Sequence, residues 1–181
     1  MACFGAILAA NQSATVGDGW MSFSARVEFS TYAGKGGIVL SDTICTANAV
    51  SLVNIGTAVD ANGASDSVAA IWFDDGATSA LFFHALSAIA NAEGSNAVTV
   101  VGPATATAGN YAPVLRIEID NLGNAFFFHN GQLFHAEPLA VTVGAEIGFR
   151  IEAGNSATTT GIDATIDYIE WVTPRPTAPT V

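Results

Sequence analysis

Two acidic side chains at alternate positions are the pair best placed to do chemistry in this chain. Glu118 and Asp120 belong to the alternating run Leu115–Asp120, and residues two apart on a β-strand project from the same face. Two carboxyl groups about 5 Å apart can serve as nucleophile and general acid in a retaining glycoside hydrolase. The next position on that face is Leu122, so no third acid completes the set. We therefore predict that the chain is not an enzyme.

Other patterns that could carry chemistry are incomplete. His129 and His135 flank Asn130-Gly131, and a tight turn there would place the two imidazoles on opposite faces, where they cannot share a metal. Residues 60–66 (DANGASD) lack the glutamate and the longer oxygen-rich pattern of a calcium loop. Residues 33–37 (AGKGG) lack the spacing of a phosphate loop. We predict no catalytic residue, no metal and no cofactor.

The elements that would position these side chains are short strands joined by turns. From Val114 to Ala136 the sequence reads as three strands, with a glycine-containing turn at residues 121–124 and a second turn at Asn130-Gly131. Asn-Gly tolerates the positive φ angles of a type I′ turn. The segment predicts an antiparallel meander with one buried face.

The register of this meander decides which side chains are exposed. With both turns tight, Ile119 faces Phe126 and Ile117 faces Phe128, while Phe128 also faces Leu133. That register puts Ile117, Ile119, Phe126, Phe128 and Leu133 in the core. The opposite face then holds Arg116, Glu118, Asp120, Phe127, His129, Gln132 and Phe134. From this mixed face we select Arg116, Glu118, Phe127, His129 and Phe134 as candidate ligand-binding or partner-binding residues.

The motif of this meander, with the ending IDATIDYIEWV at residues 162–172, resembles concanavalin A-like jelly rolls. That group includes legume lectins, laminin-G domains and glucanases. The resemblance implies two stacked antiparallel sheets and does not by itself imply sugar binding. The paired aspartate and asparagine metal ligands of lectins are not identifiable in this chain. Non-catalytic jelly rolls of this kind resemble the accessory domains of bacteriophage capsids, tails and fibres.

Composition limits the function further. The formal net charge is −11, from 16 acidic and 5 basic residues, so the chain repels phosphate backbones and nucleic acid is excluded as a partner. Charged residues make up only 12%, and Lys35 is the only lysine. A surface with so few charged side chains suits a subunit packed against neighbours, although the acidic charge alone could keep a monomer soluble. Cys3 and Cys45 are too few for a disulfide framework. We expect two free thiols, with a single Cys3–Cys45 disulfide as the alternative.

The rest of the chain reads as further strands. They are expected at residues 20–29, where Phe23, Ala25, Val27 and Phe29 would form the apolar face, and at residues 38–41, after a turn at Gly36-Gly37. Further strands are expected at residues 68–74, 77–84, 98–101 and 147–152, with Asp75-Gly76 as a hairpin turn and residues 85–92 (ALSAIANA) as a short helix or loop. The apolar start at residues 2–10 is too short to span a bilayer. We predict an all-β, two-sheet antiparallel jelly-roll sandwich over residues 1–173, beginning with a strand or arm. An extended Pro/Thr tail follows at 174–181.

Three functions remain open at this point. The first is a non-enzymatic structural or adhesion subunit of a virus particle, such as a bacteriophage capsid decoration or tail-associated protein. Such a subunit would form homo-oligomers, contact other virion proteins and be located in the virion, with no membrane partner. The alternative is a carbohydrate-binding module or a receptor-binding lectin-like domain, for which glycan would be the ligand. The third is a glycoside hydrolase of the jelly-roll glucanase type.

Overall fold

The computed structural model describes most of the predicted strands of the 181-residue chain. The described residues are 2–4, 14–30, 32, 35–42, 67–74, 82–89, 92–93, 99–101, 111–154 and 162–174. Several sequence-based predictions lie outside them: the loop at residues 60–66, the turn at Asp75-Gly76, the thiol of Cys45 and the tail beyond residue 174.

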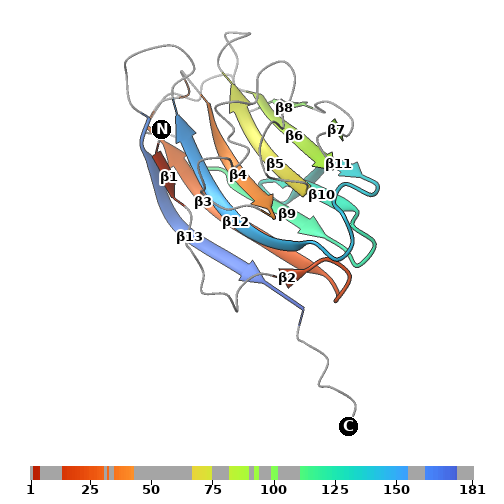
Figure 1. The fold of residues 1–181 in the computed structure, drawn as a ribbon. Helices are drawn as coiled ribbons and strands as arrows, with labels where there is room; N and C mark the ends of the chain where they lie inside the picture. The colour runs from red at the N-terminus through yellow and green to blue at the C-terminus, as the bar shows by residue number, and fades with distance from the viewer. Residues whose placement is uncertain are drawn as a thin grey trace.

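The described strands form two antiparallel sheets stacked as layers (Figure 1). The eight-stranded sheet has the order β1 (Ala2–Phe4), β12 (Glu146–Gly154), β4 (Lys35–Ser41), β5 (Ser67–Asp74), β6 (Phe82–Ile89) and β7 (Ala92–Glu93), with β2 (Ala14–Thr15) beside β12 and β8 (Thr99–Val101) beside β6. The five-stranded sheet has the order β11 (Gln132–Glu137), β10 (Ala125–His129), β9 (Val114–Ile119), β3 (Met21–Phe29) and β13 (Ala164–Val172). The all-β sandwich predicted from the sequence is confirmed.

The core lies between the sheets and is rich in aromatic side chains. Phe23 on β3 stacks on Phe149 of β12 with ring centroids 4.3 Å apart, and Phe29 meets Phe73 of β5 edge-on at 4.8 Å. All four rings belong to the main buried cluster. Because each pair joins one sheet to the other, the alternation predicted for residues 20–29 positions the two layers against each other.

The central strands of the eight-stranded sheet, β12, β4 and β5, are buried on both faces. Ile71 and Phe73 belong to the core between the sheets, whereas Ala70 and Trp72 point the other way and are also buried. Val39 on β4, the partner of Ala70, is likewise fully buried on this outward face. Continuous burial explains why β5 reads as an unbroken apolar run.

The predicted register of β9 and β10 is wrong by one residue. Ile119 pairs with Ala125, and Ile117 pairs with Phe127. The turn is one residue longer than predicted because Asp120 leaves the ladder: its backbone N–H donates to the Asn124 carbonyl, and its own carbonyl accepts from Gly123 N–H. A shift of one residue exchanges the two faces of a strand. Consequently β10 buries Ala125, Phe127 and His129, and the predicted core residues Phe126 and Phe128 lie half-buried on the outside.

The second turn follows the prediction, but the strand after it does not. Asn130 and Gly131 adopt φ angles of 50° and 81°, as a type I′ turn requires, and Phe128 pairs with Leu133 as expected. A bulge then shifts the pairing so that Phe127 faces His135. The predicted core residue Leu133 is exposed, because it shares the outer side with Phe128.

Two smaller predictions also change. The segment expected to be a helix or loop from residue 85 continues β6 as a strand up to Ile89, since small alanines fit a sheet that is buried on both sides. Gly36 and Gly37, expected in a turn, lie within β4. A Cβ on Gly37 would stand 2.0 Å from the Ile71 carbonyl oxygen, so close backbone approach requires glycine there.

Candidate functional site

The outer side of the five-stranded sheet holds part of the predicted site. Arg116 and Glu118 project from β9 on this side and form an ion pair, with Arg116 Nη1 3.2 Å from Glu118 Oε1. Trp20 Nε1 donates a hydrogen bond of 3.4 Å to the other Glu118 oxygen. Both predicted residues therefore lie together in a surface setting, where polar contacts already constrain the carboxylate.

Apolar side chains continue this side toward the sheet edge. The Arg116 guanidinium lies over the Phe128 ring, with its carbon 4.0 Å from the ring centroid, a cation–π contact. Phe128 in turn pairs with Leu133 on β11, whose exposed fraction is 53%. We call the set Trp20, Arg116, Glu118, Phe126, Phe128 and Leu133 the outer surface. It combines an ion pair with aromatic and aliphatic contact area.

The other three predicted binding residues do not reach this surface. Phe127 is fully buried in the core beside His135, with ring centroids 5.7 Å apart. Phe134 is half-buried and packs against the same core. The one-residue register error and the bulge in β11 account for both placements. The prediction that Phe127 and Phe134 share an exposed face with Arg116 is therefore wrong.

His129 is also an interior residue. Its ring lies 5.2 Å from the Phe83 ring, centroid to centroid, and its Nε2 is 2.6 Å from the Tyr111 hydroxyl oxygen. Burial lowers the pKa of His129, because the cationic form loses hydration in the core. The placement favours a neutral histidine with a structural partner.

Glu118 and Asp120, the two carboxyl groups that could suggest hydrolysis, lie in different settings. Glu118 is on β9, whereas Asp120 belongs to the turn that follows it. Asp120 Oδ1 accepts hydrogen bonds from the backbone N–H groups of Leu122 at 2.8 Å and Asn124 at 2.9 Å, and Oδ2 accepts from the Asn124 amide at 2.7 Å. Partial burial alone would raise the pKa of Asp120, but these hydrogen bonds outweigh it and lower the pKa. A carboxyl group held ionised as a turn cap is poorly suited to act as a general acid.

The outward face of the eight-stranded sheet carries a second group of polar residues. Arg150 and Glu152 form an ion pair at 2.5 Å between Nε and Oε1, and their side chains are 1% and 2% exposed. Across neighbouring strands, Glu152 pairs with Gly37, Gly37 pairs with Trp72, and Trp72 pairs with His84. The ring centroids of Trp72 and His84 lie 5.0 Å apart. This group was not predicted from the sequence, although the spacing of Arg150 and Glu152 places both side chains on one face of a strand.

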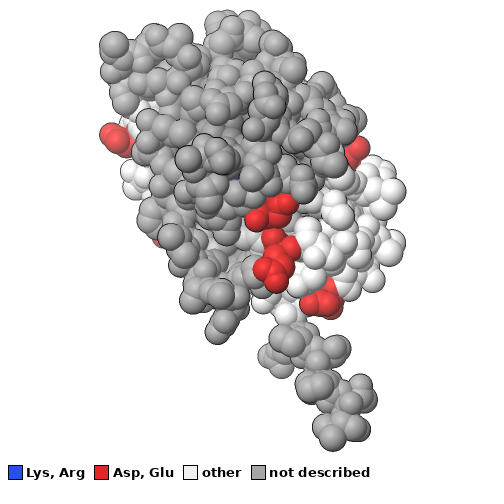
Figure 2. Space-filling view, viewed as in Figure 1, with Lys and Arg blue, Asp and Glu red and all other residues white. Residues whose placement is uncertain are grey.

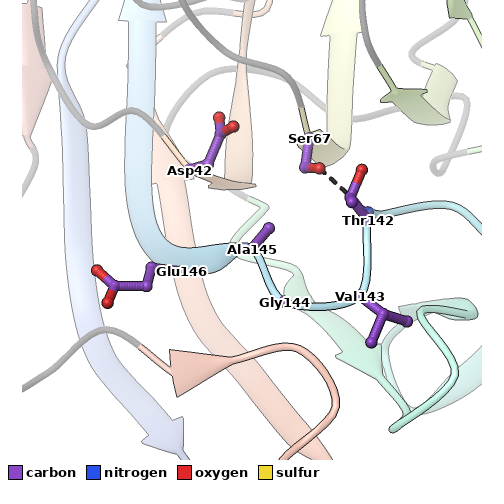
Figure 3. Close-up of a pocket in the computed structure, with 7 residues that line it drawn as sticks. All are labelled: Asp42, Ser67, Thr142, Val143, Gly144, Ala145 and Glu146. Atoms are coloured by element: carbon purple, nitrogen blue, oxygen red, sulfur yellow. Dashed lines mark hydrogen bonds between the residues drawn. The ribbon is translucent and has the colours of Figure 1, made fainter.

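A cavity of about 580 Å³ opens at one end of the sandwich (Figure 3). It is lined by Asp42, Ser67, Thr142, Val143, Gly144, Ala145 and Glu146. Ser67 Oγ accepts a hydrogen bond of 3.1 Å from the Thr142 backbone N–H, which ties the loop before β12 to the start of β5. Among the described lining residues, the charged groups are the carboxylates of Asp42 and Glu146.

Two further findings concern metals and membranes. Among the residues that the structure describes, no group of three or more His, Cys, Asp or Glu side chains is arranged to hold a metal ion. The same part of the chain contains no helix long and apolar enough to cross a membrane.

The two stacked antiparallel sheets give the protein the fold of a concanavalin A-like jelly-roll sandwich. No protein-family model and no curated protein matches the chain. Similar solved structures include a Bacillus licheniformis β-glucanase, at 13% identity and a TM-score of 0.52, covering 91% of this chain and 69% of that one. Another is the alginate lyase A1-II′, at 12% identity and a TM-score of 0.54, covering 96% and 71%.

A third similar structure is a β-1,3-1,4-glucanase (lichenase) derived from a mouse hindgut metagenome, at 12% identity and a TM-score of 0.51. The match covers 87% of this chain and 67% of the lichenase. At such low identity these likenesses establish a shared fold. The glucanase part of the sequence resemblance is thus supported at the level of architecture, and the bacteriophage part stays a prediction.

Proposed function

We propose that this chain is a non-enzymatic adhesion subunit that binds its partners through the outer surface. The observation that carries the proposal is the exposed apolar area of Phe128 and Leu133 beside the Arg116–Glu118 ion pair. Aromatic, aliphatic and arginine side chains together are typical of protein interfaces. The setting we propose is a virus particle, in which the subunit would contact sister copies and other virion proteins.

The distribution of carboxylates supports a binding role over a catalytic one. Glu118 on β9 contacts Arg116 and Trp20, and Asp120 accepts hydrogen bonds within the turn that follows β9. On the outward face of the eight-stranded sheet, Glu152 is buried against Arg150. These three carboxyl groups are therefore held by partners within the protein, which does not suit the nucleophile and general acid of a glycoside hydrolase.

Native mass spectrometry of the purified chain tests the adhesion role. The proposal predicts oligomers of the wild-type chain that dissociate on Leu133→Asp, because a carboxylate would be placed in the apolar part of the interface. Leu139→Asn, a change of an exposed leucine in a loop outside this surface, is the matched control and should leave the oligomer intact. A wild-type chain that stays monomeric and binds no shell or tail component would contradict the proposal.

Carbohydrate binding is a second candidate, favoured by the contact between Trp20 and Glu118. An exposed indole beside a hydrogen-bonding carboxylate can hold a sugar by its apolar face and a hydroxyl group. A glycan array probed with the wild type and with Trp20→Ala separates this candidate from the first. Signal that is lost in the variant supports sugar binding, whereas an empty array speaks against it.

Polysaccharide cleavage is the third candidate, and its support is the fold shared with glucanases and alginate lyases. An assay for new reducing ends, with β-glucan and alginate as substrates, tests it directly. Turnover that persists through repeated purification would overturn the non-enzymatic proposal.

A further inference from the structure

A second surface, which shares no residue with the outer surface, lies at the end of the sandwich where β3 and β12 begin and β9 and β11 end. We call it the loop end. Two loops meet there, residues 120–124 and residues 138–145. Three large apolar side chains point into solvent from these loops: Leu122, Leu139 and Val143 are 59%, 67% and 56% exposed.

The loops of this end are fixed to each other by hydrogen bonds. The Val141 backbone N–H donates to the Gly123 carbonyl at 3.1 Å, and the Leu139 N–H donates to the Asn124 side chain at 2.9 Å. Gly123 has a φ of 81°, and a Cβ on it would stand 2.3 Å from the Val141 carbonyl oxygen, so this close contact requires glycine. The exposed apolar side chains therefore stand on a preorganised frame, which lowers the ordering cost of binding.

The frame extends to the cavity of Figure 3. Gly144 N–H donates to the Val16 carbonyl at 2.7 Å, and the Val16 N–H donates to the Ala145 carbonyl at 3.0 Å. Val143 belongs to both features, because it lines the cavity and is also one of the three exposed apolar residues. The apolar patch and the cavity are thus one continuous surface.

The charge of this surface is negative. Asp42 and Glu146 line the cavity, and the exposed Asp18 follows directly after Val16 and Gly17. Figure 2 shows a group of acidic side chains near the middle of that view, beside the large area drawn in grey. Asp42 also acts on Arg150, where it opposes the lowering of the arginine pKa by burial. A partner that fits here must bring positive charge.

We propose that the loop end binds an extended segment of another protein in which leucine-like and basic side chains alternate. The apolar side chains would cover Leu122, Leu139 and Val143, and an arginine or lysine would enter the cavity toward Asp42 and Glu146. A second copy of this chain fits poorly, because its net charge is −11. The described arginines are also already paired, Arg26 with Asp167, Arg116 with Glu118 and Arg150 with Glu152. A phospholipid surface fits poorly as well, since carboxylates repel phosphate head groups.

Fluorescence anisotropy with a labelled probe peptide tests the proposal. The probe is a six-residue peptide of alternating leucine and arginine, and its two controls replace either every arginine by glutamate or every leucine by serine. The proposal predicts saturable binding of the probe that weakens with salt, and much weaker binding of both controls. Equal binding of the serine peptide would reduce the effect to unspecific charge attraction and overturn the proposal.

Variants of the protein locate the binding. Glu146→Gln should weaken the probe about two- to fivefold, as expected for a surface ion pair. Leu139→Asn should weaken it about fivefold or more through lost apolar contact, and asparagine tolerates the φ of 52° at this position. Asp163→Asn at the opposite end is the matched charge control, and Leu133→Asp on the outer surface is the control for the other interface. Both should bind the probe as the wild type does.

Two outcomes would overturn the proposal. One is a loss of probe binding in Asp163→Asn equal to that in Glu146→Gln. The other is co-sedimentation of the protein with phosphatidylcholine vesicles that disappears in Leu139→Asn, which would assign the apolar side chains to a membrane. Because the probe assay and the native mass measurement use different surfaces, failure of one leaves the other standing.

Discussion

Removing one partner of the Arg150–Glu152 ion pair should destabilise the fold strongly. The two side chains are 1% and 2% exposed. Arg150→Met therefore leaves the Glu152 carboxylate buried without this cation, and Glu152→Gln leaves the Arg150 guanidinium buried without this carboxylate. Each single change should cost about 3–5 kcal/mol of unfolding free energy. For a domain of this size that corresponds to a drop of about 6–20 °C in melting temperature. Urea unfolding followed by tryptophan fluorescence measures the loss.

The double variant and a surface control make the prediction sharp. Arg150→Met combined with Glu152→Met removes both charges and should be far more stable than the sum of the two single losses. Arg26→Met breaks the Arg26–Asp167 pair, whose side chains are 49% and 63% exposed, and should cost about 1 kcal/mol or less. If the Arg150 variant were as mild as the Arg26 variant, this face of the sheet would be open to water and the burial argument would fail.

Three further predictions concern the meander. Phe127→Ala should cost about 3–5 kcal/mol and Phe128→Ala clearly less in urea unfolding; similar losses would contradict the observed register. Asp120→Ala should remove stability that is present above the ordinary carboxyl pKa and is lost as pH falls through the lowered pKa of the folded state. The difference in stability between wild type and variant should therefore be largest at pH 7 and smaller at pH 3. Because the pKa of His129 is lowered on folding, the wild type should lose stability as pH falls below about 6.5. His129→Gln should make the unfolding free energy depend less on pH in this range. An unchanged dependence would assign the titration to another group.

The architecture was predictable because hydrophobic alternation and turn chemistry are local signals. The apolar face of residues 20–29 and the Asn130-Gly131 turn can be read directly from the residues, and both are confirmed. The strand β6 was harder. Its alanines favour a helix in isolation, and their place in a sheet buried on both faces depends on contacts distant in sequence.

The outer surface was predictable only in part, since the residues that compose it depend on the register of the strands. Arg116 and Glu118 were placed correctly because they lie before the first turn. Phe127 and Phe134 were misplaced because Asp120 caps the first turn and because a bulge shifts the pairing of β10 with β11 between Phe127 and Phe128. Aspartate at the start of a glycine-containing turn is a recognised signal, so the first error could have been avoided. A bulge leaves no comparable mark in residues 132–137.

Burial of both faces of the eight-stranded sheet has a consequence for how the two sheets tolerate sequence change. Along β9, every second side chain faces outward, so a saturation library should accept polar residues at every other position. Along β5, side chains on either side are enclosed, so acceptance should be uniformly low from Val68 to Phe73. The two sheets would then diverge at different rates in related sequences, with the solvent-facing layer free to acquire new contacts while the enclosed layer preserves the shape.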